Sequence, residues 1–297
     1  MTYCYVCPHR CGVDRPESLQ GEGTFGSCGC GMQPIVARAA LHYWEEPCIS
    51  GTKGSGTVFF SGCNLHCVFC QNYEISSLNK GQEISVARLR EIYFELIKQG
   101  ALNINLVTPT HFTEAIIASL QEPLPVPVVY NTSGYETQDT LRKLKGKVQI
   151  WLPDLKYSDD LAAIKYSNAN NYFRIATDAI KTMFAQTGPY KLNDDGIMQS
   201  GVIIRHLLMP GMLENTLKVI DWVAATFRPG EVMFSLMHQY IPCGRAAEFP
   251  EINRKVSPEE YKTAEQYLLD STIEDGFIQE EMAASDEFIP KFDGTGV

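Results

Sequence analysis

The sequence predicts an α/β fold in which six parallel strands, each followed by a helix, form a partial (β/α)6 barrel. The first observation is that β-prone and helix-periodic stretches alternate from residue 57 to residue 245. The second is that there are six β-prone stretches, fewer than the eight of a closed barrel. The third is a change of composition near residue 56, before which the chain is rich in cysteine and glycine.

The elements follow one another along the chain. The expected strands are 57–62, 103–108, 126–131, 148–156, 201–211 and 231–242. The expected helices are 85–100, 112–121, 137–146, 158–167, 171–188, 213–227 and 257–276. Ser85 and Ser257 stand at expected N-caps, Pro258 at a first helical position and Gly100 at a helix end. Because sites form where parallel strands end, the loops after these strands are the candidate site.

These elements divide the chain into three parts. Residues 1–56 are expected to form an irregular, cysteine-rich N-terminal segment that could hold an auxiliary metal. Its stretch 42–51, HYWEEPCISG, is expected to pack the segment on the barrel through Tyr43 and Trp44; covering the mouth of the barrel is the alternative. Residues 57–245 form the partial barrel, and residues 246–297 form a C-terminal helix and a loose acidic tail.

Composition limits the classes of function. The net charge of −10 opposes general binding to nucleic acid. The sequence holds no run of about 18 apolar residues that could span a membrane. The start, MTYCYVCPHRC, lacks the apolar core of a secretory signal. We therefore expect a cytoplasmic protein without membrane or nucleic-acid partners.

Cysteine usage points to metal. Nine of the ten cysteines lie within the first 70 residues, and disulfides are a poor explanation in a reducing cytosol. The stretch SGCNLHCVFCQN places Cys63, Cys67 and Cys70 in a C-x3-C-x2-C pattern directly after the first expected strand of the barrel. A structural zinc site takes four closed ligands, whereas three thiolates on a [4Fe–4S] cluster leave one iron open. An open iron can chelate a small molecule through an amine and a carboxylate. A zinc knuckle or a structural cluster is the alternative.

This motif, after the first strand of a partial barrel, resembles that of the radical S-adenosylmethionine (SAM) superfamily. The longer string GSGTVFFSGCNLHCVFCQNYEIS, residues 54–76, is most similar to the pyruvate formate-lyase activating enzyme group, within it to a branch with an N-terminal cysteine segment. The resemblance covers residues 1–245. It implies that Cys63, Cys67 and Cys70 hold three irons of a [4Fe–4S] cluster, that SAM chelates the fourth, and that reductive cleavage of SAM gives a 5′-deoxyadenosyl radical for hydrogen abstraction.

The resemblance also implies SAM-binding positions at later strand ends. Where the activating enzymes have Gly-Gly-Glu, this chain has VTPTHF, without a carboxylate; where they have Asp-Thr-Asn-Gly, it has YNTSGYE. PDLK matches their Asp-x-Lys motif, IIRHLLMPG supplies a strand arginine, and LMHQYIP places Tyr240, with His238 beside it, near their SAM-proximal histidine. The expected cofactor-binding residues are Thr108, Pro109, Thr110, His111, Asn131, Thr132, Ser133, Asp154, Lys156, Arg205 and Tyr240.

The N-terminal cysteines form a second group. Cys4, Cys7, Cys11 and Cys28 could close a four-thiol site around either a second [4Fe–4S] cluster or a zinc ion. The sequence leaves the choice between the two metals open.

Three functions remain in view. The resemblance favours an activase that makes a glycyl radical on a partner enzyme, served by a reductant such as flavodoxin or ferredoxin under anaerobic conditions. Radical modification of a small molecule or peptide is the second. A non-catalytic metal-binding scaffold is the third, and it leaves the polar residues at the strand ends unexplained. No residue is assigned as a catalytic acid or base.

Overall fold

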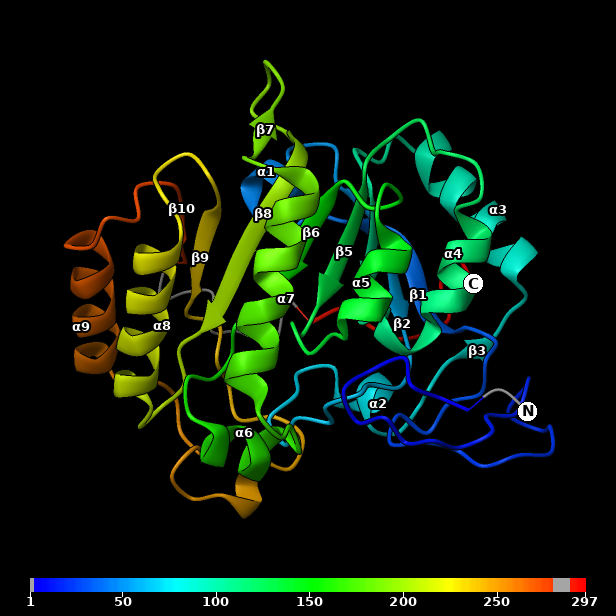
Figure 1. Cartoon of the computed structure of the whole chain (residues 1–297), viewed down its shortest axis with the longest axis horizontal. Helices are drawn as coiled ribbons and strands as arrows, with labels where there is room; N and C mark the ends of the chain where they lie inside the picture. Colours follow the sequence, from blue (N-terminus) through cyan, green and yellow to red (C-terminus); the bar gives the residue numbers. More distant parts are fainter. Residues whose placement is uncertain (1–2, 280–288) are drawn as a thin grey trace.

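The computed structural model describes residues 3–279 and 289–297 (Figure 1). Its main sheet has the strand order β10-β9-β8-β6-β5-β4-β2-β1-β3, with β7 paired to β8. The strands are β1 Ile35–His42, β2 Ser55–Phe60, β3 Gln82–Glu83, β4 Ile104–Val107, β5 Val128–Thr132, β6 Ile150–Pro153, β7 Lys191–Leu192, β8 Met198–Leu207, β9 Met233–Met237 and β10 Gly276–Ile278. The six predicted strands correspond to β2, β4, β5, β6, β8 and β9, which are parallel neighbours in this order. The α/β partial barrel is confirmed, and its sheet is not closed.

Helices follow the predicted pattern with small shifts at their ends. They are α1 Pro47–Ser50, α2 Tyr73–Ser76, α3 Val86–Lys98, α4 Thr113–Ser119, α5 Gln138–Leu144, α6 Asp160–Ser167, α7 Tyr172–Thr187, α8 Leu213–Thr226 and α9 Pro258–Leu269, with short 3-10 turns η1 Thr110–Phe112 and η2 Ala246–Glu248. Both predicted N-caps are confirmed, because the Ser85 side chain accepts from the Arg88 amide and Ser257 forms a capping box with Glu260. None of the helices in the described ranges is long and apolar enough to cross a membrane.

Three regions differ from the prediction. The segment 1–56 contains an eight-residue strand, β1, whose sequence IVARAALH has the alanines of a helix; antiparallel pairing with β2 outweighs that propensity. The expected helix 257–276 ends at Leu269, and β10 follows it. The tail is not loose over residues 289–297, because Gly294 donates to the Ala37 carbonyl and Ala39 to that of Thr295. The stretch 280–288 of the predicted tail lies outside the described residues.

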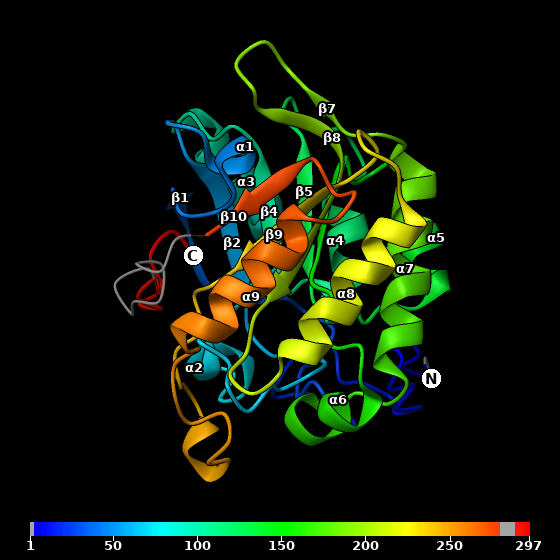
Figure 2. The ribbon, with the colours of Figure 1, turned by 90° about the vertical axis from the view of Figure 1, so that its left-hand side faces the viewer.

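The curved sheet has two buried faces. Helices α7, α8 and α9 lie on one side of it (Figure 2) and share one buried hydrophobic cluster with strand residues such as Trp151 and Phe234. The opposite face of the sheet is its inner face. At one end it carries an apolar layer that includes Val129 and Ile203, and α1 covers this layer. Figures 1 and 2 both show α1 at one end of the sheet and α2 at the other. The space enclosed by the inner face is called the lumen below.

Candidate functional site

Residues 61–72, here called the rim loop, leave the carboxyl end of β2 and carry the three motif cysteines. The Cys63 and Cys67 side chains are buried, that of Cys70 is partly buried, and all three are free thiols. Gly62 and His66 have φ values of 79° and 53°, so the loop reverses direction sharply around the first two thiols. A Cβ on Gly62 would lie 2.3 Å from the Cys30 sulfur, which shows how tightly the N-terminal segment packs on this loop.

The sulfur atoms already have hydrogen-bond donors. The Leu65 amide donates to Cys63 Sγ at 3.3 Å, and the Ser167 hydroxyl donates to Cys67 Sγ at 2.9 Å. Burial raises the pKa of Cys63 to about 11 and of Cys67 to about 12, while Lys156 lowers both. Hydrogen-bond donors and a nearby cation stabilise buried thiolate sulfurs that are bound to iron.

An ion-pair network lies beside the rim loop at the ends of β5, β6 and β8. Arg205 donates from Nε to Asp154 Oδ1 at 2.9 Å and from Nη2 to Asn131 Oδ1 at 2.6 Å. Its Nη1 also reaches Glu45 Oε2 at 3.2 Å, and Lys156 pairs with the other oxygen of Asp154. The structure therefore brings together four of the predicted positions, and it adds Glu45, which the sequence analysis had not selected.

The network fixes the charges of its members. Burial alone would raise the pKa of Asp154, but Lys156 and Arg205 outweigh it and hold the pKa below its usual range. For Lys156 and Arg205, burial lowers the pKa and Asp154 more than compensates, so both pKa values are raised. All three groups are therefore ionised near neutral pH. Strand alternation turns His206 away from them, as predicted, and its Nε2 lies 2.9 Å from Thr216 Oγ1 on α8.

The predicted threonines meet a second buried acid. Thr110 and Thr132 each donate to Glu136 Oε1 at 2.5 Å, and burial raises the pKa of Glu136 to about 7. Glu136 supplies the carboxylate that the VTPTHF stretch lacks, from the next loop along the sheet. Sequence spacing gave no signal for it, because only the pairing of β4 with β5 brings the two loops together. Thr108 holds the intervening turn with a φ of 58°.

The other predicted positions have different surroundings. His111 Nε2 lies 2.8 Å from the Ser61 carbonyl, and burial lowers the pKa of His111 to about 3, so this ring anchors the rim loop as a neutral group. Pro109 precedes η1. The Ser133 hydroxyl is buried without a hydrogen-bond partner in the described residues. The Tyr240 hydroxyl donates to the Ile252 carbonyl at 2.7 Å, and the His238 ring stacks on Tyr261 at 3.8 Å.

A cavity of about 150 Å³, here called the lumen cavity, connects these groups with the segment that precedes β2. That segment, residues 43–54, is called the floor segment, and it inserts Glu45 and Glu46 into the lumen. The cavity is lined by His42, Trp44, Glu45, Glu46, Phe59, Gln71, Asn72, Val107, Asn131, Arg205, Met237, Gln239, Gln279, Ile289 and Pro290. Tyr43 and Trp44 are largely exposed, so their predicted packing role is wrong and the buried residues of this stretch include the acid Glu46.

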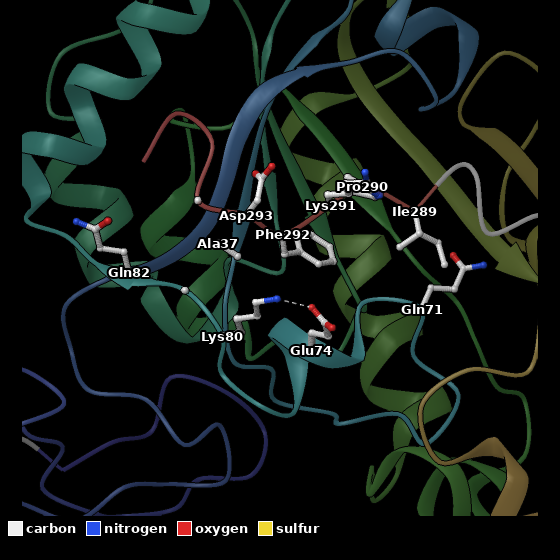
Figure 3. A pocket seen from close by; sticks show the side chains of 12 residues that line it. Ala37, Gln71, Glu74, Lys80, Gln82, Ile289, Pro290, Lys291, Phe292 and Asp293 are labelled. Carbon is white, nitrogen blue, oxygen red and sulfur yellow. Dashed lines mark hydrogen bonds and ion pairs between the residues drawn. The ribbon is translucent and has the colours of Figure 1, made fainter.

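A larger pocket of about 660 Å³ adjoins the lumen cavity, and Gln71, Ile289 and Pro290 line both (Figure 3). Figure 3 shows this outer pocket between the C-terminal segment and α2, with the Lys80–Glu74 ion pair of 2.8 Å on one wall. The C-terminal segment thus borders the route from the surface to the lumen. No sequence motif marks this role.

The N-terminal cysteines lie against the rim loop. Cys7 and Cys28 are buried, and burial together with the neighbouring thiols Cys28 and Cys11 raises the pKa of Cys7 to about 12. The Ser27 amide donates to Cys11 Sγ at 3.3 Å. Within the described ranges, no three Cys, His, Asp or Glu side chains converge on the position of a single metal ion. A second metal in this segment stays a prediction.

The sequence profile of the radical SAM superfamily matches residues 57–223, which is more than half of the chain. The chain belongs to the radical SAM superfamily. The uncharacterized protein MJ0674 of Methanocaldococcus jannaschii is 32% identical over 281 residues, which cover 90% of this chain and 75% of that protein. The similarity to this relative extends over nearly the whole length of the chain.

Solved structures of radical SAM proteins resemble the fold. SuiB of Streptococcus suis bound to S-adenosylmethionine has a TM-score of 0.49 and 13% identity over 76% of this chain, which spans only half of the SuiB chain. A spore photoproduct lyase variant with bound AdoMet and dinucleoside spore photoproduct has a TM-score of 0.50 and 11% identity over 81% of each chain. At these identities the likeness concerns the fold alone.

The family implies SAM and a [4Fe–4S] cluster, and the rim loop fits both. A cubane cluster takes each thiolate on a different iron, so its ligands need not converge on one point as those of a zinc ion do. The loop carries three free thiols, two of which accept hydrogen bonds, and it has no fourth cysteine, which matches a cluster held by three thiolates. Beside them, the cations Lys156 and Arg205 match the carboxylate of SAM.

Proposed function

We propose that this chain is a radical SAM enzyme in which Cys63, Cys67 and Cys70 hold the [4Fe–4S] cluster and leave one iron for SAM. The observation that carries the proposal is the rim loop itself, where three free thiols, two of them accepting hydrogen bonds, lie beside the Arg205–Asp154–Lys156 network. When bound and reduced, the cluster supplies the electron that splits SAM into methionine and a 5′-deoxyadenosyl radical, which takes a hydrogen atom from the substrate.

The residues of the chain have separate tasks in this proposal. Lys156 lies close enough to the three thiols to lower the pKa of each, and its charge offsets that of the bound thiolates. Arg205 and Lys156 bind the SAM carboxylate, and Asp154 holds both cations in position. Glu136, held by Thr110 and Thr132, accepts from the SAM amine. The N-terminal segment, sealed on Gly62 by Cys30, excludes water from this side of the loop.

The lumen favours a small molecule or a peptide side chain as the substrate. The lumen cavity is narrow, about 150 Å³, and polar groups line it. A glycyl-radical activase must instead admit a loop of a folded partner. The activase remains the second candidate, supported by the similarity of residues 54–76 to the activating enzymes. In either case a low-potential donor such as flavodoxin or ferredoxin supplies the electron.

Anaerobic reconstitution tests the proposal. The protein should bind four irons per chain at the rim loop, and dithionite with SAM should yield 5′-deoxyadenosine. With a deuterated candidate substrate, deuterium should appear in the 5′-deoxyadenosine. Transfer from the glycine of a partner enzyme would identify an activase, whereas transfer from a small molecule or peptide would identify the first candidate. A reconstituted protein that binds no cluster, or a reduced one that leaves SAM intact, would remove the proposal.

A further inference from the structure

The lumen cavity is lined by more carboxyl groups than permanent cations. Glu45 and Glu46 line it together with Arg205, whereas Asp154 and Lys156 form an ion pair beyond Arg205 and outside the lining. Arg205 directs its donors to Glu45, Asp154 and Asn131. Lys156 is paired with Asp154. Among the described residues, Glu46 accepts no hydrogen bond from either base, although the charge of Arg205 acts on it.

Glu46 has an open hydrogen-bonding position inside the molecule. Its residue exposure is 7%, yet Oε2 has no hydrogen-bond partner among the described residues. A buried polar oxygen without a partner costs roughly 1–3 kcal/mol, so a group in this state marks the place of a missing donor. Burial raises the pKa of Glu46 to about 7, with Arg205 and, less strongly, Ser235 lowering it, and Oε2 still has no hydrogen-bond donor among the described residues.

The other walls of the cavity also suit a cation. Phe59 is buried and presents an aromatic ring, and Trp44 lies at the exposed end. Aromatic faces attract ammonium groups, by about 0.5–2 kcal/mol depending on exposure. A cavity of about 150 Å³ accepts the end of an alkyl chain with some water, since one water molecule takes up about 30 Å³ in the liquid.

We propose that the lumen cavity binds a protonated primary amine of the substrate, with Glu46 Oε2 as the acceptor of its N–H groups and Glu45 as the neighbouring negative charge. This inference rests on the proposed function, because the rim loop must hold the radical chemistry while the floor segment holds the substrate. Glu46 is a binding residue in this account, and it takes no part in cleaving SAM.

SAM also carries an ammonium group, and a competition experiment separates the two roles. Amine binding to the floor segment should be unaffected by saturating SAM, which occupies the rim loop. The measurement uses the reconstituted protein without SAM and with saturating SAM, and two probes of equal length, Nα-acetyl-lysine methylamide and Nα-acetyl-norleucine methylamide. Binding is followed by saturation-transfer NMR.

The lysine probe should bind at least tenfold more tightly than the norleucine probe, and Glu46→Gln should remove this preference. Glu95→Gln is the matched control, because Glu95 pairs with Arg88 on the outer face of α3. The Glu95→Gln variant should prefer the lysine probe as strongly as the wild type does. Equal affinities for the two probes, no binding of either, displacement of the lysine probe by SAM, or an unchanged preference in Glu46→Gln would overturn the inference.

The same samples keep this inference apart from the proposed function. If SAM is not cleaved while the lysine preference depends on Glu46, the radical chemistry fails and the amine site stands. If SAM is cleaved and the preference is absent, the amine site fails alone. Circular dichroism of Glu46→Gln checks that the variant folds, and retained binding of SAM confirms that its rim loop is intact.

Discussion

The two connections that flank β2 differ in chemistry although they belong to one short strand. The floor segment leads into the strand with two carboxylates, and the rim loop leaves it with three thiols. Six residues of strand separate the backbones of the two connections by about 20 Å, and the Glu45 side chain spans part of this distance by pairing with Arg205 at 3.2 Å. Thiolates are soft ligands suited to iron, whereas carboxylates attract cationic groups. In the proposed account, this difference divides the work of the barrel along the strand direction, with the cofactor at the rim and the substrate at the floor.

Removing thiols from the two connections should give the largest difference. Replacing Cys63, Cys67 and Cys70 by alanine should lower 5′-deoxyadenosine formation by roughly a thousandfold or more, because the cluster has no other ligands on the loop. Cys48→Ala removes a buried thiol of the floor segment that contacts Met233 Sδ at 3.9 Å. We expect this control to stay within about twofold of the wild type.

Both outcomes are read by chromatography of the reaction products after anaerobic reconstitution. If the variant without Cys63, Cys67 and Cys70 still cleaved SAM, the reducing cluster would lie elsewhere, and the N-terminal cysteines would be the next candidate ligands. A large loss in Cys48→Ala would break the division between rim and floor.

Glycine replacements compare the packing of the two connections. Gly62→Ala places a Cβ 2.3 Å from Cys30 Sγ at a φ of 79°, and should lower the free energy of unfolding by about 2–5 kcal/mol. Gly51→Ala in the floor segment has a φ of 47°, and its Cβ would meet only the movable ends of Ile197 and Leu102. We expect a smaller loss, about 1–2 kcal/mol.

Urea unfolding followed by circular dichroism measures both losses. Adding Cys30→Ala to the Gly62→Ala variant should recover about 1 kcal/mol or more, because it removes the closest atom. No recovery would mean that backbone strain alone accounts for the cost at the rim.

The rim and the floor also differ in how far the sequence predicts them. The rim loop is predictable because three cysteines at fixed spacing follow a β-prone run, and local spacing is preserved when the chain folds. The acids of the floor segment give no such signal, since Glu45 and Glu46 stand beside exposed Trp44 and resemble a surface stretch. Their role depends on contacts with Arg205, which lies 160 residues away along the chain.

The same distinction applies to the fold. The six parallel strands follow from their local pattern and from the helices between them. β1 and β10 do not, because their pairing with β2 and β9 is what makes them strands. Likewise Glu136 joins the threonines of two loops only through the pairing of β4 with β5.

A pH series isolates the buried acid of the floor. Burial raises the pKa of Glu46 to about 7, so the folded protein binds a proton that the unfolded chain releases above pH ~4.5. The Glu46 carboxyl therefore makes its full contribution to the free energy of unfolding below pH ~4.5. This contribution, about 3 kcal/mol, is lost as the pH rises from there through 7. Urea unfolding between pH 4.5 and 8 should show a flatter curve for Glu46→Gln. Glu136→Gln should remove a separate part of the slope, because the pKa of Glu136 is also raised to about 7.

If the free energy of unfolding of Glu46→Gln depended on pH as steeply as that of the wild type, the wild-type carboxyl would be in contact with water or a cation in solution. Glu46 would then titrate like a surface acid. A steeper slope would contradict the sign of the pKa shift.

The smallest effect concerns the donor to Cys67. Ser167→Ala removes the hydroxyl that donates to Sγ at 2.9 Å, and should shift the cluster potential negative by roughly tens of millivolts, because such donors stabilise the reduced cluster. Ser271→Ala is the control, since its hydroxyl donates to the Leu268 carbonyl far from the loop. A redox titration followed by EPR should separate the two. Equal potentials would show that this hydrogen bond is not kept in the loaded enzyme.

The central claim is that the rim loop leaves one iron open and that SAM fills it. Electron–nuclear double resonance of the reduced protein with SAM carrying ¹⁵N in its amino group tests this directly. The account predicts a ¹⁵N coupling of the size expected for nitrogen bound to iron, absent from the Cys63, Cys67 and Cys70 alanine variant. A wild-type cluster that binds SAM without such a coupling would contradict it.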